Sequence, residues 1–157
     1  MKVLIIHCGK TEEKYLITGI DKYENRLKHY LQVETIYLPL LKNTQALSKE
    51  AQKEKEGKNI LSKIQNTDFV VLLDEKGKYF TSIDFSKYIN QHLNSGTKRL
   101  VFVTGGPYGF SQEIYEKAHY KLSLSPMTFS HQMVRLFFIE QLYRAMTIQK
   151  GEPYHHE

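Results

Sequence analysis

The sequence predicts an α/β domain built on a mostly parallel sheet of five to six strands, with helices on both faces. Two observations indicate this class. Segments typical of strands and of helices alternate from one end of the chain to the other. Strand-like runs such as VVLL at residues 70–73 are apolar throughout, as expected when both faces of a sheet are covered. No repeat, low-complexity stretch or linker divides the chain, so residues 1–157 are expected to form a single domain.

Strands are expected where β-branched residues, leucine and phenylalanine cluster between turn residues. The first run, KVLIIH, leads to Gly9, and the second is closed by Pro39. The fourth leads into the glycine-rich turn GGPYGF, and the fifth is short. The expected strands are residues 2–7, 34–38, 68–74, 99–104 and 121–123.

Helices are expected between these strands, where apolar residues recur every three or four positions. The first has this pattern at Leu16, Ile20 and Leu27. The second opens with SKEAQKEKEGK, which is almost wholly charged. We interpret that run as a solvated face, with RNA contact as the alternative. The expected helices are residues 13–31, 48–64, 86–94, 112–119 and 131–147.

The last expected helix is apolar on most of its sides, as the run LFFI at residues 136–139 illustrates. Such a helix either lies centrally in a core or is shared with another subunit. We favour a dimer interface; a helix packed across the sheet of a monomer is the alternative.

Composition restricts the classes of protein to consider. Hydrophobic residues make up 41% of the 157 residues and charged residues 25%, which is ordinary for a globular protein, and no apolar run is long enough for a membrane span. Cys8 is the only cysteine, so no intrachain disulfide can form and a cytoplasmic location is expected. A net charge of +5 favours a polyanionic partner.

Candidate ligand-binding residues follow from the predicted fold, because ligands of open α/β sheets bind at the carboxyl ends of strands. Three segments lie at such ends: residues 73–74, 104–109 and 124–128. Glycines in the second allow backbone to approach a ligand closely, although a plain tight turn is the alternative. The usual dinucleotide and triphosphate loops are absent, and no histidine or cysteine spacing is typical of a metal site.

Polar residues on the last helix lead toward the terminal sequence YHHE. Glu140 and Arg144 are four residues apart, the spacing of a surface ion pair. The alternative is that the end of this helix and the tail form a basic surface that binds phosphate. Composition does not separate these two interpretations.

Three longer segments, FVTGGPYGFSQE, LSLSPMTFSHQMVRLFFIEQLYRAMTI and the terminal PYHHE, together closely resemble one family. This is the ribosomal RNA large subunit methyltransferase H family (RlmH), a minimal member of the SPOUT class. The resemblance spans the whole chain and is sharpest from Arg99 onward. It implies a SPOUT α/β knot, with a C-terminal trefoil knot, that works as a homodimer. The implied reaction transfers methyl from S-adenosyl-L-methionine to N3 of a pseudouridine (position 1915) in helix 69 of 23S rRNA, in the assembled 70S ribosome, without a metal or a membrane.

The resemblance also implies site residues. Cofactor contacts are expected at the three strand ends found from the fold: Leu73, Gly105, Leu124, Ser125, Pro126, Met127, Thr128 and Phe129. Pro126 has no N–H to donate, so only its carbonyl is available there.

The tail residues Tyr154, His155 and His156 resemble the family's terminal Tyr-His-basic element, which in a dimer is expected to complete the partner's site. His155 is the first candidate for accepting the N3 proton, and Glu140 the second, as base or as the group that orients His155. Tyr154 is expected to stack on the base or close the pocket.

Four further residues are expected to contact RNA or to stabilise charge on the uracil: Arg144, Arg135, His131 and His156. Two other functions remain open at this point. One is a non-catalytic ribosome- or RNA-binding protein of the same fold, and the other is a SPOUT methyltransferase acting on another RNA.

Overall fold

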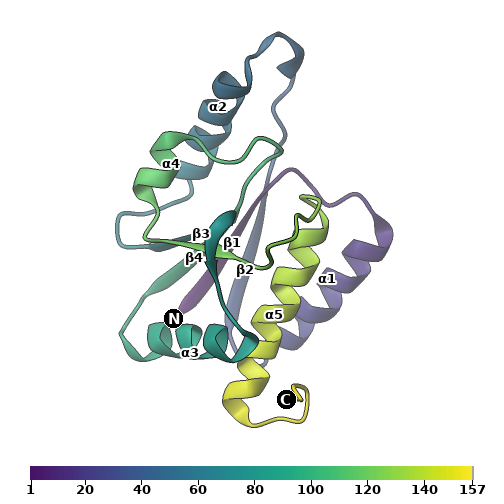
Figure 1. Cartoon of the computed structure of the whole chain (residues 1–157), viewed down its shortest axis with the longest axis vertical. Coiled ribbons are helices and arrows are strands. Elements are labelled where there is room, and N and C mark those ends of the chain that lie inside the picture. The colour runs from purple at the N-terminus through teal and green to yellow at the C-terminus, as the bar shows by residue number, and fades with distance from the viewer. Residues whose placement is uncertain (157) are drawn as a thin grey trace.

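The computed structural model describes residues 1–156 (Figure 1). Strands and helices alternate along the chain as the sequence predicts. In chain order they are β1 (Lys2–Cys8), α1 (Lys14–Leu27), β2 (Gln32–Leu38), the 3₁₀ helix η1 (Thr44–Ala46), α2 (Lys49–Leu61), β3 (Phe69–Tyr79), α3 (Ser82–Asn94), β4 (Arg99–Thr104), α4 (Gln112–Lys117), β5 (Tyr120–Ser123) and α5 (Met133–Lys150).

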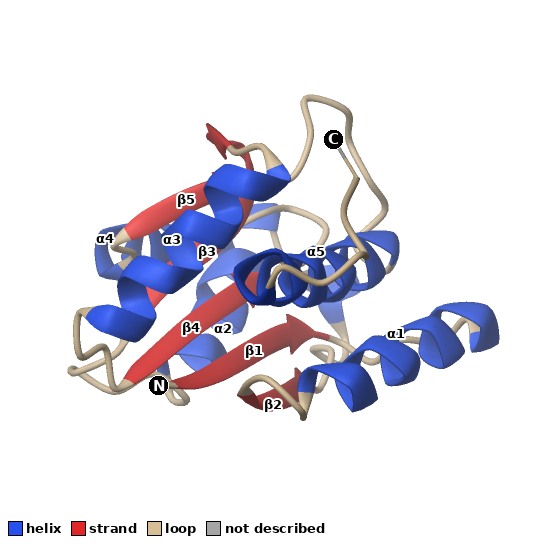
Figure 2. Cartoon of the chain, turned by 90° about the horizontal axis from the view of Figure 1, so that it is seen from below, coloured by secondary structure: helices blue, strands red, loops and turns tan. Residues whose placement is uncertain are grey.

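The strands form one five-stranded sheet in the order β2-β1-β4-β3-β5, and every pairing is parallel. Helices α1, α3 and α5 cover one face, and α2 and α4 cover the other (Figure 2). This arrangement confirms the predicted α/β class. Because all strands run in one direction, the carboxyl ends of β4, β3 and β5 lie next to one another at one edge of the sheet.

The apolar strands are buried on both sides, as their sequences predict. In β4, Leu100 and Phe102 contribute to the core under α1, α3 and α5, while Val101 and Val103 contribute to the core under α2 and α4. All four side chains are fully buried. Successive residues of a strand point to opposite faces, so a central strand needs apolar residues at every position.

Side-chain caps set the starts of three helices. Ser48 accepts a hydrogen bond from the Ala51 N–H, Thr81 from the Asp84 N–H and Ser111 from the Ile114 N–H. The cap at Thr81 starts α3 four residues before the predicted position, because it satisfies N–H groups that the helix itself leaves unpaired. At the other end of the chain, Gly151 ends α5 in the left-handed conformation with φ 65°.

Strand β3 is longer than predicted. We expected it to end at Asp74, but its register shifts between Leu73 and Lys78, and it then pairs again with β5 as far as Tyr79. The sequence DEKGK in this stretch carries no apolar alternation, so its strand conformation depends on pairing with β5. We call residues 74–77 the β3 bulge.

Helix α5 packs across the sheet and against α1 and α3. Its residues Phe138, Ile139, Leu142, Ala145 and Met146 are buried in this core. This is the packing that we gave as the alternative to a dimer interface. Phe137 nevertheless stays 40% exposed on the same helix, so part of its apolar surface is not used within the chain. Within residues 1–156, no helix is long and apolar enough to cross a membrane.

Candidate active site

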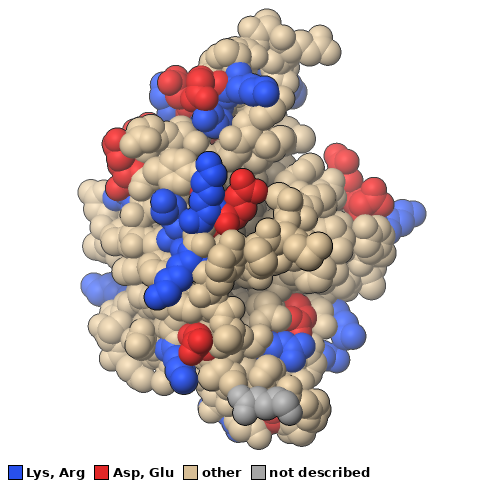
Figure 3. Space-filling view, viewed as in Figure 1, with Lys and Arg blue, Asp and Glu red and all other residues tan. Residues whose placement is uncertain are grey.

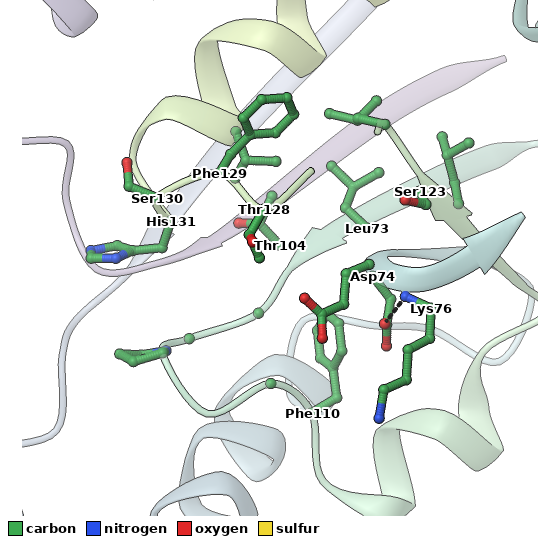
Figure 4. Close-up of a pocket in the computed structure, with 18 of the residues that line it drawn as sticks. Leu73, Asp74, Lys76, Thr104, Phe110, Ser123, Thr128, Phe129, Ser130 and His131 are labelled. Atoms are coloured by element: carbon green, nitrogen blue, oxygen red, sulfur yellow. Dashed lines mark hydrogen bonds between the residues drawn. The ribbon is translucent and has the colours of Figure 1, made fainter. Parts of the chain in front are cut away.

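The predicted strand-end segments surround one cavity at the carboxyl edge of β3, β4 and β5, with a volume of about 590 Å³. That volume lies in the range of sites that bind small molecules. Figure 4 shows side chains from all three segments around it, with Phe110 on the side opposite Phe129. The parallel sheet therefore brings together three segments whose residues lie about 15 to 55 positions apart in the sequence.

Most of the predicted cofactor residues line this cavity. They are Leu73, Gly105, Leu124, Ser125, Met127, Thr128 and Phe129. Pro126 is absent from the lining, and His131, which we expected to contact RNA, forms part of the wall instead.

Sequence reasoning did not assign several other lining residues, among them Phe110, Tyr115 and Val134. Phe110 is the last residue of the glycine-rich turn GGPYGF, so its place at the cavity could have been predicted from the sequence. The other two come from helix α4 and the start of α5, and their positions depend on how those helices pack.

The glycine-rich turn is held closely against its neighbours. A Cβ on Gly105 would lie 3.2 Å from the Phe110 ring, and a Cβ on Gly106 would lie 2.5 Å from the carboxylate of Glu56 on α2. Gly109, at φ +81°, donates its N–H to the Gly106 carbonyl at 3.1 Å and closes the turn. Glycine is required here for close approach, which leaves the backbone of the turn facing the cavity.

A buried polar pair supports the part of the cavity wall that Thr104 forms. The Thr104 hydroxyl lies 2.8 Å from Nδ1 of His7 on the neighbouring strand β1, and both residues are at most 3% exposed. Burial, and then the positive charge of Arg135, lower the pKa of His7 to about 3. His7 is therefore neutral at neutral pH and fixes the Thr104 side chain without adding charge to the cavity.

The β3 bulge forms another wall. Asp74 accepts hydrogen bonds from the Lys76 N–H at 2.8 Å, shown as the dashed line in Figure 4, and from the Tyr115 hydroxyl at 2.6 Å. Burial, and then the hydrogen bond to Asp74, raise the pKa of Tyr115. The tyrosine therefore remains a donor, and it ties α4 to the bulge.

The loop after β5 carries the remaining predicted cofactor residues. Ser125 organises it: its carbonyl accepts from the Ser123 hydroxyl at 3.0 Å and its own hydroxyl accepts from the Met127 N–H at 2.9 Å. Met127 is 75% exposed, and Phe129 stacks near Phe137 with a ring-centroid distance of 4.7 Å. An apolar surface thus borders the cavity at the start of α5.

The four predicted catalytic residues form a second cluster, made by the middle of α5 and by the tail that folds back onto it. Glu140 Oε1 accepts hydrogen bonds from Arg144 Nη2 at 2.6 Å and from the Tyr154 hydroxyl at 3.0 Å. Arg144 lies 4.8 Å from the centroid of the Tyr154 ring, and its Nη1 lies 3.4 Å from Nδ1 of His155. We call Glu140, Arg144, Tyr154 and His155 the tail cluster.

Contacts with α1 and with the helix itself hold the tail in place. The Tyr154 ring packs edge-on against Tyr143 at 4.9 Å, and its hydroxyl lies 3.2 Å from that of Tyr23. The Tyr30 hydroxyl donates to Glu152 at 2.6 Å, and this hydrogen bond, with burial, raises the pKa of Tyr30 to about 12. The tail is therefore packed and not frayed. His156 is exposed, and Glu157, the last residue of the predicted tail element, lies outside the described residues.

Within one chain the tail cluster and the cavity lie at different levels of α5. Val134 in the first turn of the helix lines the cavity, whereas Glu140 and Arg144 lie six and ten residues further along, and the tail folds back onto them. A helix rises 1.5 Å per residue, so the cluster lies roughly 9 to 15 Å further along the helix axis than Val134. Figure 1 shows the chain turning back at the lower end of α5.

Arg135 does not have the exposure that we expected of an RNA-binding residue. It is 2% exposed, and its guanidinium donates to the Cys8 carbonyl at 2.7 Å and to the Thr11 hydroxyl at 2.9 Å. The side chain thereby fastens the loop after β1 to the start of α5. A phosphate could not reach it in this arrangement, so we do not carry its RNA contact into the proposal below.

The cavity fits S-adenosyl-L-methionine in size and in the character of its walls. Leu73, Leu124 and Met127 offer apolar surface for a ring, and the glycine-rich turn offers backbone groups. Within the part of the chain that is described, no group of three or more His, Cys, Asp or Glu side chains could hold a metal ion.

Comparisons with known proteins place the fold and the cavity in a class. A family model described as "Predicted SPOUT methyltransferase" matches residues 1–155. Three similar curated proteins carry the name "Ribosomal RNA large subunit methyltransferase H". They come from Christiangramia forsetii (58% identical, covering 99% of each chain), Flavobacterium johnsoniae (57%, 100% of each) and Parabacteroides distasonis (56%, 100% of each). The chain therefore belongs to the ribosomal RNA large subunit methyltransferase H family of SPOUT methyltransferases, which confirms the resemblance read from its motifs.

Proposed function

We propose that this protein methylates ribosomal RNA with S-adenosyl-L-methionine, and that its target is N3 of a pseudouridine (position 1915) in helix 69 of 23S rRNA in the assembled ribosome. The observation that carries the proposal is the cavity at the carboxyl edge of β3, β4 and β5, lined by seven of the eight predicted cofactor residues. Its position agrees with the general rule for ligand sites in α/β sheets. The relatives' names support ribosomal RNA as the substrate.

The cofactor, when bound, supplies an electrophilic methyl group. The apolar residues Leu73, Leu124 and Met127 would cover its adenine, and the backbone of the turn at Gly105 would hydrogen-bond to it. Exposed Met127 would become covered on binding. These roles are predictions from the positions of the residues.

The tail cluster has the groups that proton removal needs. N3 of pseudouridine carries a proton that must leave as the new N–C bond forms. A guanidinium can only donate, so in its 3.4 Å contact with Arg144 the Nδ1 of His155 is the acceptor and its lone pair is occupied. His155 would accept the N3 proton at this nitrogen after the imidazole leaves Arg144 in the complete site. Glu140 holds Arg144 in position through hydrogen bonds of 2.6 and 3.1 Å. Arg144 would then stabilise the charge that develops on a uracil carbonyl.

We propose that a second copy of the chain brings these two parts together. Methyl transfer needs its reacting atoms about 3–3.5 Å apart, whereas within one chain the tail cluster lies roughly 9 to 15 Å further along α5 than Val134 of the cavity. The exposed apolar residues Met127, Phe129 and Phe137 border the cavity and offer a surface for the partner. In such a dimer the partner's tail would lie over the cavity.

Two measurements test the proposal. Calorimetry should detect binding of S-adenosyl-L-methionine, and no binding at millimolar cofactor would favour a non-catalytic RNA-binding protein. Mass spectrometry of 23S rRNA from cells that lack the protein should show one missing methyl group, which the wild-type gene restores. A missing methyl group in a different RNA would keep the chemistry and replace the substrate. The protein is expected to act in the cytoplasm, where ribosomes are.

A further inference from the structure

A second, more open groove adjoins the cofactor cavity, with a volume of about 710 Å³. It lies between the second half of β3, helix α4 and strand β5. The groove and the cavity share a wall made by Asp74, Lys76 and Tyr115, so the β3 bulge separates them as a ridge. Nothing in the proposed chemistry uses this groove.

Three exposed lysines line the groove: Lys76, Lys78 and Lys121. None of them takes part in an ion pair between side chains of residues 1–156. Two extend over aromatic rings: Lys121 Nζ lies 5.6 Å from the centroid of Tyr115, and Lys78 Nζ lies 6.0 Å from that of Phe80. Figure 3 shows Lys and Arg atoms in a run across this face, in front of β3 and β5.

The carboxylate, imidazole and amide groups that line the groove have partners within the protein. Asp74 is its one acidic residue and accepts the two hydrogen bonds described above. His119 Nδ1 accepts from the Val70 N–H at 3.1 Å, and its ring stacks on Phe69 at 4.7 Å. Gln112 donates to Glu116, which lies outside the lining, at 3.1 Å. The three lysine ammonium groups are thus available for an external anion.

The form of the groove favours a chain of phosphates over a small ligand. A site for a small molecule is usually enclosed and mostly apolar, whereas this groove is open and basic. A basic groove with aromatic side chains between the cations is typical of surfaces that follow a nucleic-acid backbone. Lys76 lines both the groove and the cavity, so a strand held in the groove would lead to the site of methyl transfer.

We propose that Lys76, Lys78 and Lys121 bind the phosphodiester backbone of the RNA strand that leads to the cofactor cavity. This inference rests on the proposed function, because it assigns a partner to the surface beside that site. It also accounts for the shape of the β3 bulge, which presents Lys76 at the ridge between groove and cavity.

The test uses the double variant Lys78→Gln/Lys121→Gln, which leaves the cavity lining unchanged. Binding to vacant 70S ribosomes and to protein-free 23S rRNA is measured over a range of salt concentrations. We expect affinity for both to fall about tenfold, and the slope of log K against log salt to fall by about 1.4, as for the loss of two phosphate contacts to a single strand. Affinity for S-adenosyl-L-methionine and kcat at saturating ribosomes should stay at wild-type values, while KM for ribosomes rises.

The matched control is Lys2→Gln/Lys98→Gln. Both residues are exposed at the opposite edge of the sheet, where the Lys2 N–H donates to the Lys98 carbonyl at 2.9 Å. This variant has the same net charge and should bind RNA like the wild type, apart from the small effect of total charge. Equal RNA affinity and salt slope in the groove variant and the control would overturn the proposal. Weaker binding to ribosomes alone, with protein-free rRNA bound normally, would also overturn it in favour of an acidic protein partner. Failure of the wild type to bind S-adenosyl-L-methionine would instead reject the proposed function, and the RNA measurements would still decide the role of the groove.

Discussion

At the residue scale, buried polar groups that no motif reveals hold the cofactor cavity in shape. His7 belongs to an apolar strand and lies beside Thr104, with its ring tilted against that of Tyr37 at a centroid distance of 5.3 Å. Arg135 donates to the carbonyl of Cys8, the last residue of the same strand β1. Burial, and then the negative charge of Glu56, raise the pKa of Cys8 to about 12, so this cysteine is an unreactive thiol. These buried side chains support the strand ends that form the cavity.

The lowered pKa of His7 predicts a specific loss of stability in acid. An unfolded histidine titrates near 6.5 and the folded one near 3, so the unfolded state binds more protons as the pH falls below about 6.5. The contribution of His7 is therefore complete above that pH and declines toward pH 3, by roughly 1 to 2 kcal/mol between pH 6.5 and 5. Urea unfolding at these two pH values should show this loss in the wild type and a correspondingly smaller loss in His7→Asn.

The control for this experiment is Thr104→Val, which removes the hydrogen-bond partner but keeps the buried imidazole. Its free energy of unfolding should be lower, while its pH dependence should stay close to that of the wild type, because burial is the main cause of the shift. An unchanged pH dependence in His7→Asn would contradict the prediction.

At the element scale, the β3 bulge is the feature that most distinguishes this sheet from a simple parallel one. The strand leaves β5 after Leu73 and pairs with it again at Lys78, and both residues pair with Leu122. Gly77 lies where the returning strand crosses β5, and a Cβ there would lie 2.6 Å from the backbone of Leu122. The bulge thereby forms a wall of the proposed cofactor cavity on one side, and on the other a wall of the groove that Lys76, Lys78 and Lys121 line.

Because backbone atoms cannot move aside as a side chain can, Gly77→Ala should be strongly destabilising. We expect a cost of about 3 kcal/mol or more, at the upper end of overpacking effects. Gly96→Ala is the matched control: Gly96 has φ +74°, and a Cβ added there would meet nothing within 4 Å, so only backbone strain of about 1 kcal/mol is expected. Thermal unfolding of the two variants should differ clearly, and equal melting temperatures would show that the crossing tolerates a side chain.

At the scale of the whole molecule, the two parts of the proposed catalytic site lie apart within one chain. Tyr23 and Tyr143 hold Tyr154 of the tail cluster, which lies further along α5 than Val134 of the cavity. Cyclic dimers place the same surface of each subunit against the other, so two equivalent composite sites would form together. This is the physical basis of the proposed dimer.

Mixing two inactive variants tests the sharing of sites. One variant lacks residues 154–157 and keeps its cavity; the other, Gly105→Arg, has a long side chain in the cavity and keeps its tail. Random pairing should give about one quarter of wild-type methylation, because half of the dimers would contain one intact composite site. Each variant alone should be inactive while it remains folded and dimeric. No recovery in a mixture shown by mass spectrometry to contain heterodimers would argue that each site is built within one chain.

The sequence by itself determined the α/β class, the five strands and the three strand ends that line the cavity. These features follow from local patterns: apolar runs mark buried strands, helical spacing marks helices, and parallel strands place their carboxyl ends together. Motif resemblance added the family and the tail element. Thr81 is a residue type that commonly caps helices, and Ile83 and Phe85 in the first turn of α3 are apolar, so the early start of this helix could have been predicted from the sequence.

Only the tertiary structure decided the burial of Arg135, the second pairing of β3 with β5, and the distance between the tail cluster and the cavity. An arginine on a helix and the sequence DEKGK both look solvent-exposed, because sequence periodicity records which residues share a face but not what covers that face. Contacts between residues more than 40 positions apart, such as Asp74 with Tyr115 and Arg135 with Cys8, determine the shape of this site.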